Sequence, residues 1–369
     1  MKKRRTPLVV AVLTAADKRR SFKGDRRNFK DIINTGTSKG ILTYIVTVED
    51  LRLRQSRIWG YHYVKSSQKW ERKKSPLPTV IYNRLPSRKV EKKAYVKKKL
   101  RACLTAGNIK LYNPFFFNKR RLFEGLKKGT LSRIQLPTTE PLTQSSFRQL
   151  LSEFDYLYLK PETGNSGKGI MTISYEPTHA QPYVVKIQNN VQTSAVRHSS
   201  KQEAWHTIRA QARNKAYIVQ QGIPLATIKG RAFDLRLLVQ KNKDGVWKVT
   251  GVGARIAGTK SITTHVPRGG KLGNPVALLR SLFGGKKASD VIKSAKQGAL
   301  EVAACIEGNE KYSLGEMSLD VGVDVKGKLW LFEANARPMK FDEKKIRKLS
   351  LTRIFQYSSY LARVKKDKE

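Results

Sequence analysis

Two alternating apolar runs near the C-terminal end of the chain predict a β-hairpin. The runs are Leu319–Val323 and Leu329–Phe332, and the Lys326-Gly327 dipeptide between them is typical of a tight turn. A turn centred between these two residues pairs positions whose numbers sum to 653. A four-residue loop would shift that pairing. The register matters because successive side chains of a strand point to opposite faces.

The predicted register places two carboxylates opposite each other. Asp320 pairs with Glu333, and Asn335 lies two residues further along on the same face. Like charges opposed across a ladder are destabilising unless a cation lies between them. Oxygen ligands of this kind suit Mg²⁺ (or Mn²⁺), which protein carboxylates share with substrate phosphates. The hairpin therefore predicts a metal–nucleotide site, and the alternative is a solvated hairpin end with unrelated acids.

A strand, a glycine-rich loop and another strand precede the hairpin by about 150 residues. Lys160 lies on the entering strand, where its point charge suits phosphate. Glycines in such a loop let backbone N–H groups approach phosphate oxygens. The loop is not a Walker A motif, because Glu162 and Gly169 stand where that motif needs a glycine and a hydroxyl. The candidate phosphate contacts of the loop are Gly164, Ser166, Gly167, Lys168 and Gly169.

The first part of the chain alternates short apolar strands with polar or helical segments, which predicts an α/β (α+β) fold. The opening apolar run spans only about six residues, too short for the core of a signal peptide, so it is interpreted as a buried strand. We expect three parts, residues 1–117, 118–230 and 231–369. The expected strands are Leu8–Leu13, Leu42–Val48, Thr79–Tyr82, Ile109–Tyr112, Asp234–Gln240 and Trp247–Ile256. The expected helices are Val90–Thr105, Asn118–Lys128, Lys201–Arg213 and an apolar helix near 286–307.

The charge of the chain is its unusual bulk property. The 369 residues carry a net charge of +46, and residues 1–130 alone hold 35 Lys and Arg against 8 Asp and Glu, a net charge of +27. Such a field attracts polyanions, among them nucleic acid, anionic polymers or an acidic coat surface. The alternative is a solvated basic face. No recognition helix, zinc finger or RNA-binding signature is evident, so nucleic acid is not the favoured partner.

Cysteine content and hydropathy indicate in which cellular compartment the protein is expected. The two cysteines, Cys103 and Cys305, fit a reducing cytoplasm and exclude a disulfide framework. No apolar run approaches the roughly 20 residues of a membrane span.

The lysine strand, the glycine-rich loop and an acidic pair ending in Glu-x-Asn resemble the ATP-grasp fold. More specifically, the chain resembles the YheC/YheD family of endospore coat-associated proteins over most of its length. The resemblance implies a small α/β domain before the ATP-grasp part, and ATP with Mg²⁺ as ligands. The strings that carry it include residues 77–84, 118–120, 217–223, 233–236, 251–255 and 332–337.

The resemblance also implies roles for individual residues. The adenine would be lined by Gln220, Gln221 and Ile223, although many ATP-grasp proteins have a glutamate near this point. Arg236 would face the phosphates or the acceptor, and Arg255 would neutralise the transferred phosphoryl group, a task that suits an always-charged fork. Lys119 is a weaker candidate phosphate contact. The loop that receives the acceptor would contain Arg268, Gly269 and Gly270.

These features predict an ATP-dependent carboxylate–amine (or carboxylate–thiol) ligase acting through an acylphosphate. The competing hypothesis is a non-catalytic spore coat protein that binds a polyanion and retains ATP binding only as a structural or vestigial property. The expected location is the cytoplasm, with association to the endospore coat implied by the resemblance.

Overall fold

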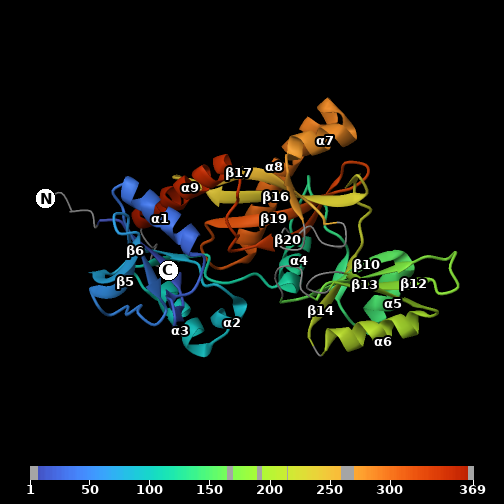
Figure 1. Ribbon diagram of the computed structural model, residues 1–369, viewed down its shortest axis with the longest axis horizontal. Coiled ribbons are helices and arrows are strands. Elements are labelled where there is room, and N and C mark those ends of the chain that lie inside the picture. The colour runs from blue at the N-terminus through green and yellow to red at the C-terminus, as the bar shows by residue number, and fades with distance from the viewer. Residues whose placement is uncertain (1–6, 164–168, 189–192, 214, 259–269, 365–369) are drawn as a thin grey trace.

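The computed structural model describes residues 7–163, 169–188, 193–213, 215–258 and 270–364. Figure 1 shows an elongated molecule with the N-terminal sheet at one end, the second sheet at the other and the third sheet between them. The predicted α/β class is confirmed. None of the helices within these ranges is long and apolar enough to cross a membrane.

The N-terminal sheet has the strand order β6-β5-β4-β1-β7-β8. Strands β1, β4, β7 and β8 are parallel, whereas β5 and β6 are antiparallel additions at one edge. The strands are β1 (Val9–Thr14), β4 (Leu42–Thr47), β5 (Arg57–Val64), β6 (Lys69–Pro76), β7 (Val80–Asn83) and β8 (Lys110–Tyr112), and a small hairpin follows β1 as β2 (Ala16–Asp17) and β3 (Ser21–Phe22). The helices of this part are α1 (Arg26–Ser38), α2 (Arg88–Glu91) and α3 (Ala94–Thr105).

Strand β1 is buried on both faces, as its unbroken apolar run predicts. Val9, Ala11 and Leu13 belong to the core on the α3 side, and Val10 and Val12 to the core on the α1 side. The four predicted strands of this part are confirmed to within a residue at each end. The predicted helix at 90–105 is instead divided into α2 and α3.

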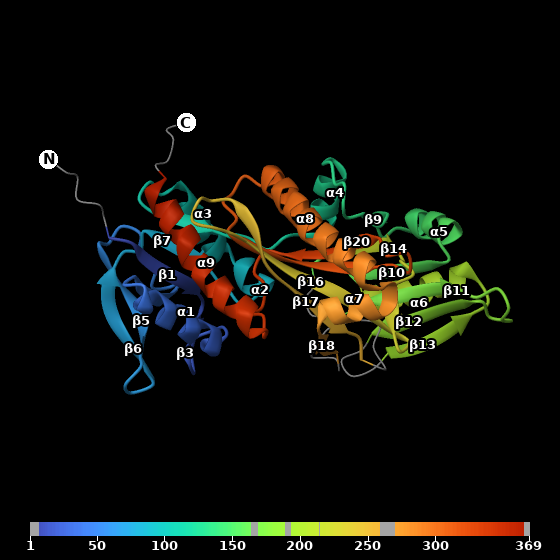
Figure 2. The ribbon, with the colours of Figure 1, turned by 90° about the horizontal axis from the view of Figure 1, so that it is seen from above.

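The last helix, α9 (Lys344–Arg363), completes the N-terminal layer. Ile354, Phe355 and Leu361 lie in the same core as Phe29 and Ile32 of α1. Figure 2 shows α9 beside α1 on one face of the N-terminal sheet. One face of the first sheet is therefore covered by the end of the chain.

The second sheet is wholly antiparallel, with the order β13-β12-β11-β10-β14-β9. Helix α4 (Lys119–Lys127), capped by Asn118, leads toward it. Helices α5 (Gln144–Glu153) and α6 (Lys201–Ala212) share its core, and α6 agrees with the predicted helix. The strands are β9 (Thr139–Pro141), β10 (Tyr156–Pro161), β11 (Met171–Tyr175), β12 (Tyr183–Gln188), β13 (Thr193–His198) and β14 (Tyr217–Gln221).

The third sheet has the order β18-β17-β16-β19-β20, with the short β15 added to β16. Helix α8 (Gly285–Asn309) packs on one face through small residues such as Ala295, Ala299 and Ala303, which allow close approach to the sheet. Helix α7 (Pro275–Phe283) precedes it. The strands are β15 (Thr227–Ile228), β16 (Arg231–Lys241), β17 (Trp247–Ile256), β18 (Lys271–Gly273), β19 (Glu316–Val323) and β20 (Leu329–Asn335).

Candidate nucleotide and metal site

The β19–β20 hairpin has the predicted register at its acidic end. Asp320 pairs with Glu333, and Ser318 pairs with Asn335. The two carboxylates and the amide are therefore neighbours on one face, as expected.

The predicted turn of this hairpin is wrong. The amide of Gly327 donates to Asp324 O at 2.9 Å and that of Asp324 donates to Lys328 O at 3.0 Å, so three residues form the loop. Gly327 has φ +83°, the left-handed conformation that such loops give to glycine. Pairs near the loop consequently sum to 652. A bulge between Asp320 and Val321 restores the register of 653 at the acidic end.

Asp320 is held by an arginine from the next but one strand. Arg255 Nη2 lies 2.9 Å from Asp320 Oδ2, and the same guanidinium donates from Nε and Nη2 to Asp234 at 2.9 and 2.6 Å. All three side chains are buried. Burial lowers the pKa of Arg255, but the two carboxylates raise it more, so the net pKa lies above its ordinary value. The guanidinium is therefore a fixed positive charge beside Asp320.

Glu333 is held by a lysine from α4. Lys119 Nζ lies 2.5 Å from Glu333 Oε1, and only 10% of the lysine side chain is exposed. Lys119 was expected to contact phosphate, and the structure places it against a carboxylate, the partner that a buried ammonium needs. Asp320 and Glu333 are therefore each paired with a buried cation in this structure.

Lys160 of β10 joins the same group of charges from the second sheet. Its ammonium donates to Gln220 Oε1 at 2.5 Å, and Gln220 Nε2 donates to Thr139 Oγ1 at 2.8 Å. Burial is the main cause that lowers the pKa of Lys160 to about 8, with Lys119 acting in the same direction and Glu333 opposing it. These interactions mean that Lys160 lies within electrostatic range of the hairpin.

The end of β14 and the segment that follows it connect the second sheet to the third. Gln221 Oε1 accepts from Thr138 N at 3.2 Å, Ile223 is buried, and Ala226 N donates to Val323 O at 2.9 Å. Gln221 also lines a cavity of about 500 Å³ between α4, the 129–138 segment and Trp330. Lys160, Gln220 and Ile223 are not among its lining residues. The three expected adenine contacts therefore do not share this cavity.

Arg236 lies on β16, two residues from Asp234 and directly opposite Asp320 on β19. Its guanidinium donates to Met339 O at 3.3 Å and lies 4.5 Å from the ring centre of Phe341. Burial is the main cause that lowers the pKa of Arg236, and Asp320 partly opposes it. Arg236 and Arg255 therefore both act electrostatically on Asp320.

Part of the predicted site lies outside the described residues, namely Gly164, Ser166, Gly167, Lys168, Arg268 and Gly269. Gly169 has φ +73°, and Tyr217 Oη donates to its carbonyl at 2.9 Å. Gly270 is buried immediately before β18.

Burial raises the pKa of Cys103 to about 12, which makes a thiolate at that position unfavourable.

The donor set of the hairpin fits a hard divalent cation. Asp320, Glu333 and Asn335 offer only oxygen ligands on one face, and the fully buried Ser318 Oγ beside Asn335 has no hydrogen-bond partner within the described ranges. Over those ranges, no group of three or more His, Cys, Asp or Glu residues gathers as a metal site, and the hairpin set consists of two carboxylates and an amide. Oxygen-only coordination suits Mg²⁺ or Mn²⁺.

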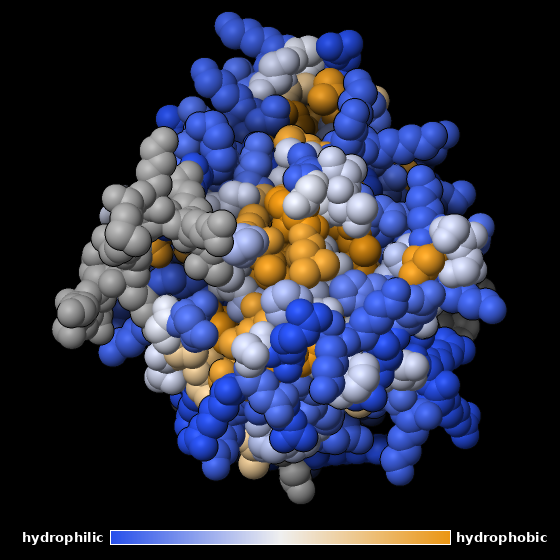
Figure 3. Space-filling model, turned by 90° about the vertical axis from the view of Figure 1, so that its left-hand side faces the viewer, coloured by the Kyte–Doolittle hydropathy of each residue, from blue (hydrophilic) through white to orange (hydrophobic). Residues whose placement is uncertain are grey.

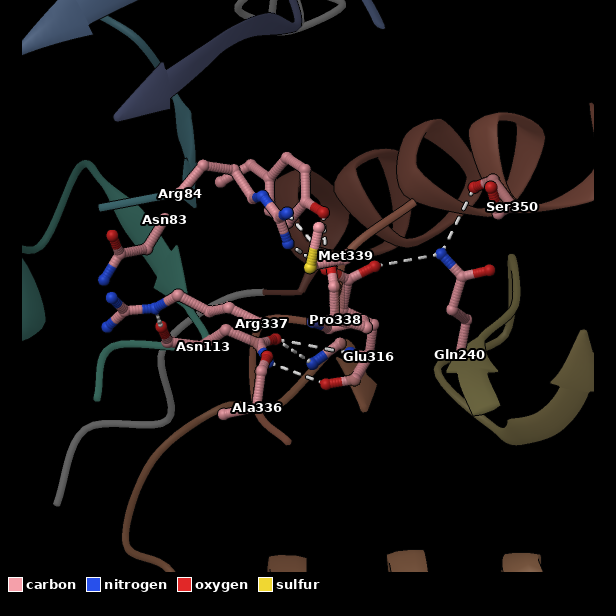
Figure 4. A network of polar contacts seen from close by, with 12 residues as sticks. Asn83, Arg84, Asn113, Gln240, Glu316, Ala336, Arg337, Pro338, Met339 and Ser350 are labelled. Atoms are coloured by element: carbon pink, nitrogen blue, oxygen red, sulfur yellow. Dashed lines mark hydrogen bonds and ion pairs between the residues drawn. The ribbon is translucent and has the colours of Figure 1, made fainter. Parts of the chain in front are cut away.

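A buried polar network fixes this hairpin to the N-terminal sheet (Figure 4). Glu316, the first residue of β19, accepts from Tyr82 at 2.5 Å and from Arg84 and Gln240 at 3.2 Å. Asn113 Nδ2 donates to Glu316 O at 2.7 Å and to Ala336 O. Burial raises the pKa of Glu316 despite the opposing effect of Arg84. Both strands of the hairpin are thereby held at their N-terminal-sheet end.

Arg337 adds a second connection. Its guanidinium forms an ion pair with Glu91 and donates to Pro114 O at 2.7 Å. The guanidinium also lies 4.0 Å from the ring centre of Phe116. The strings around Arg84 and Arg337 carry the family resemblance but predict no role for these two residues. Asn113 and Glu316 are not predictable from the sequence, because their contacts join segments about 200 residues apart and leave no local signal.

The three sheets, with a buried lysine on the second and two carboxylates on the hairpin of the third, match the ATP-grasp class of proteins that the family model identifies, and this fold generally binds ATP and Mg²⁺. The chain belongs to the YheC/D-like ATP-grasp family, whose model matches residues 108–361. It is 30% identical to the endospore coat-associated protein YheD of Bacillus subtilis (strain 168) over 353 residues, covering 93% of this chain and 76% of that relative.

Solved structures share the fold at low sequence identity. The D-alanine-D-alanine ligase of Coxiella burnetii has a TM-score of 0.54 at 13% identity, covering 96% of this chain and 95% of the ligase. The VanG D-Ala:D-Ser ligase of Enterococcus faecalis has a TM-score of 0.53 at 11% identity, covering 96% of this chain and all of the ligase. The macrocyclase MdnC of Microcystis aeruginosa MRC, solved with its precursor peptide, has a TM-score of 0.54 at 11% identity, covering 95% of this chain and all of the macrocyclase.

Proposed function

We propose that this protein is an ATP-dependent carboxylate–amine (or carboxylate–thiol) ligase. The observation that supports the proposal most directly is the proximity of Lys160 from the second sheet to the β19–β20 hairpin, where its ammonium lies 5.4 Å from the ring centre of Phe332, the residue next to Glu333. Lys160 supplies a cation for phosphate, and the hairpin supplies oxygen ligands for a metal that neutralises phosphate charge. A purely structural site would not require both.

Each candidate residue then has a task. Asp320, Glu333 and Asn335 would hold Mg²⁺, which supplies charge neutralisation to the phosphates. Lys160 and the backbone of the 164–169 loop would bind and orient those phosphates. Gln220, Gln221 and Ile223 would contact the base, and Arg268, Gly269 and Gly270 would receive the acceptor.

The two arginines would stabilise charge during transfer. The bidentate contact with Asp234 fixes the orientation of Arg255, and a preorganised guanidinium stabilises developing negative charge without reorganisation. Arg236 lies opposite Asp320 and would act from the neighbouring strand. Their always-charged side chains suit a site from which water is excluded.

The proposed chemistry has two displacements. An oxygen of the substrate carboxylate attacks the γ-phosphorus of ATP, and the bond from that phosphorus to the bridging oxygen breaks, which gives an acylphosphate and ADP. The amine nitrogen (or thiolate sulfur) then attacks the carbonyl carbon and expels inorganic phosphate. The amine loses its proton in this step. No covalent enzyme intermediate is needed, which agrees with the burial of Cys103.

The test is incubation of the protein with Mg²⁺-ATP, a pool of carboxylates and a pool of amines and thiols. We expect ADP release that depends on both pools, with a product mass equal to acid plus nucleophile minus water. An Arg255→Lys variant keeps a charge but loses the fork, so it should bind ATP and form little product. Nucleotide binding without acceptor-dependent ADP release would favour the non-catalytic alternative.

That alternative is a coat-associated protein whose basic surface binds an anionic polymer or an acidic coat surface. The net charge of +46 favours it, as does the printed name of the B. subtilis relative. For both functions we propose a cytoplasmic location, with association to the endospore coat as the printed name of the relative suggests. Product formation would decide between them.

A further inference from the structure

The outer strand of the N-terminal sheet, β6, carries a concentrated positive charge. Lys69, Arg72, Lys73 and Lys74 of this strand are all exposed, and Glu71 is its one acidic residue. Strand β6 is the terminal strand of the sheet, and Figures 1 and 2 show it at the outer border of the molecule, away from the second sheet. In Figure 3, which looks onto this end, hydrophilic residues make up most of the surface around a central apolar area.

The β5–β6 register places cations and aromatic rings on the same face. Trp59 pairs with Lys74, and Tyr61 pairs with Arg72. The guanidinium of Arg72 lies 4.7 Å and the ammonium of Lys74 5.7 Å from the ring centre of Trp59, which is itself 41% exposed. The ring restricts the motion of both cations, so they are partly ordered before any ligand arrives.

The local acids do not neutralise this strand. Arg72 pairs with Asp50 and Lys73 with Glu71, both at 2.6 Å. In these pairs the side chains of Arg72 and Lys73 remain 46% and 57% exposed. Arg57 adds a further cation from β5 and donates to the carbonyl of Lys74 at 2.8 Å. The strand therefore retains a net positive charge after its own ion pairs are formed.

An exposed strand edge offers backbone N–H and C=O groups to another strand, and lysines on such an edge oppose pairing with an identical strand. The same charges favour an acidic strand, because opposite charges across a ladder attract and like charges repel. Alternate residues of a strand lie about 7 Å apart on one face. Acids at alternate positions of an added strand would meet the cations of β6 in register.

We propose that β6 is a docking edge for an extended acidic segment of a partner protein, which adds to the N-terminal sheet as a further strand. Main-chain hydrogen bonds to β6 supply affinity, and the cations select acidic side chains. The proposal concerns the end of the molecule opposite the second sheet and does not depend on ligase activity.

The first test measures binding of a labelled peptide of about ten residues with alternating Glu and Thr to the full chain. Arg72→Glu combined with Lys74→Glu should weaken binding about tenfold or more, since both side chains lie on one face of β6 and two attractive cross-strand pairs become repulsive. The matched control is Lys293→Glu combined with Lys296→Glu, which makes the same charge change at exposed positions of α8. An equal loss in the control would overturn the proposal in favour of a general electrostatic field.

The second test separates strand addition from charge alone. Bound peptide should slow hydrogen exchange of β6 amides, and N-methylation of alternate peptide amides should abolish both binding and protection. Equal binding of the N-methylated peptide would overturn the proposal, as would binding of single-stranded oligothymidylate with no binding of the peptide. Stabilisation by Mg²⁺-ATP should persist in both charge variants, so failure here remains distinct from failure of the ligase proposal.

Discussion

Glu333→Gln separates metal binding from folding most sharply, because it changes one charge and almost no volume. Glu333 is opposite Asp320 and is paired with Lys119, with 22% of its side chain exposed. In the ligand-free protein the loss of this half-buried ion pair should cost about 1–3 kcal/mol, since it leaves a buried ammonium uncompensated. We expect the variant to fold, with a lower melting temperature than the wild type.

The response to nucleotide is the decisive quantity. A ligand at one hundred times its Kd stabilises the native state by about 2.7 kcal/mol. An unfolding entropy of about 2.1 cal/mol/K per residue gives about 0.8 kcal/mol/K for 369 residues, so Mg²⁺-ATP should raise the Tm of the wild type by about 3–4 °C. Glu333→Gln should lose most of that rise.

The assay is thermal unfolding with ATP, with and without Mg²⁺. The matched control is Glu140→Gln, which also removes a glutamate paired with a lysine of α4, Lys127 at 2.8 Å, but at an exposed position. This control should keep the full nucleotide response. If the wild type and Glu333→Gln respond equally to Mg²⁺-ATP, the assignment of the hairpin as the metal site is refuted.

Three further predictions follow from buried groups. The folded pKa of Lys160, about 8, lies below its ordinary value of 10.5. The unfolded state therefore binds more protons between those values, so the unfolding free energy of the wild type relative to Lys160→Met should rise from pH 8 to 10.5. The stabilisation by ATP should shrink above pH 8, because the ammonium is lost. If neither quantity changes with pH, the lowered pKa of Lys160 is contradicted. Asn113→Ala should cost about 2–4 kcal/mol in urea unfolding, because Asn113 binds backbone groups at Gly315, Glu316 and Ala336, and a loss below about 1 kcal/mol would contradict the network. Gly222→Ala should lower the Tm while Gly107→Ala leaves it unchanged, because a Cβ at 222 would lie 2.5 Å from Tyr156 O and one at 107 meets no atom within 4 Å; equal effects would count against this packing.

The β19–β20 hairpin shows which structural features the local sequence pattern can predict and which it cannot. Alternation of apolar and polar residues identified both strands, and a turn centred between Lys326 and Gly327 predicted that Asp320 pairs with Glu333, a pairing that is confirmed. The route to that register was wrong, because a three-residue loop and a bulge compensate each other. Loop length and bulge position depend on backbone twist and packing against α8, and neither leaves a periodic signal in the sequence.

The charges around the hairpin were predicted singly but not as pairs. Arg255 was expected to meet phosphate, whereas in this structure it joins Asp234 to Asp320. That contact exists because β16 lies between β17 and β19. The pairing of Lys119 with Glu333 likewise depends on the placement of α4. A desolvated charge needs a partner, but sequence alone does not say which partner the fold supplies.

The sequence by itself determined most of the predicted local elements, the excess of positive charge and the residue types of the candidate metal–nucleotide site, because burial periodicity and side-chain chemistry are local properties. Tertiary structure alone decided that α9 covers the N-terminal sheet and that Asn113 and Glu316 fix the hairpin to it. It also decided that β6 is the terminal strand carrying exposed cations. Each of these rests on contacts between segments far apart in the chain, where the gain from burial depends on which surfaces meet and not on the pattern within either segment.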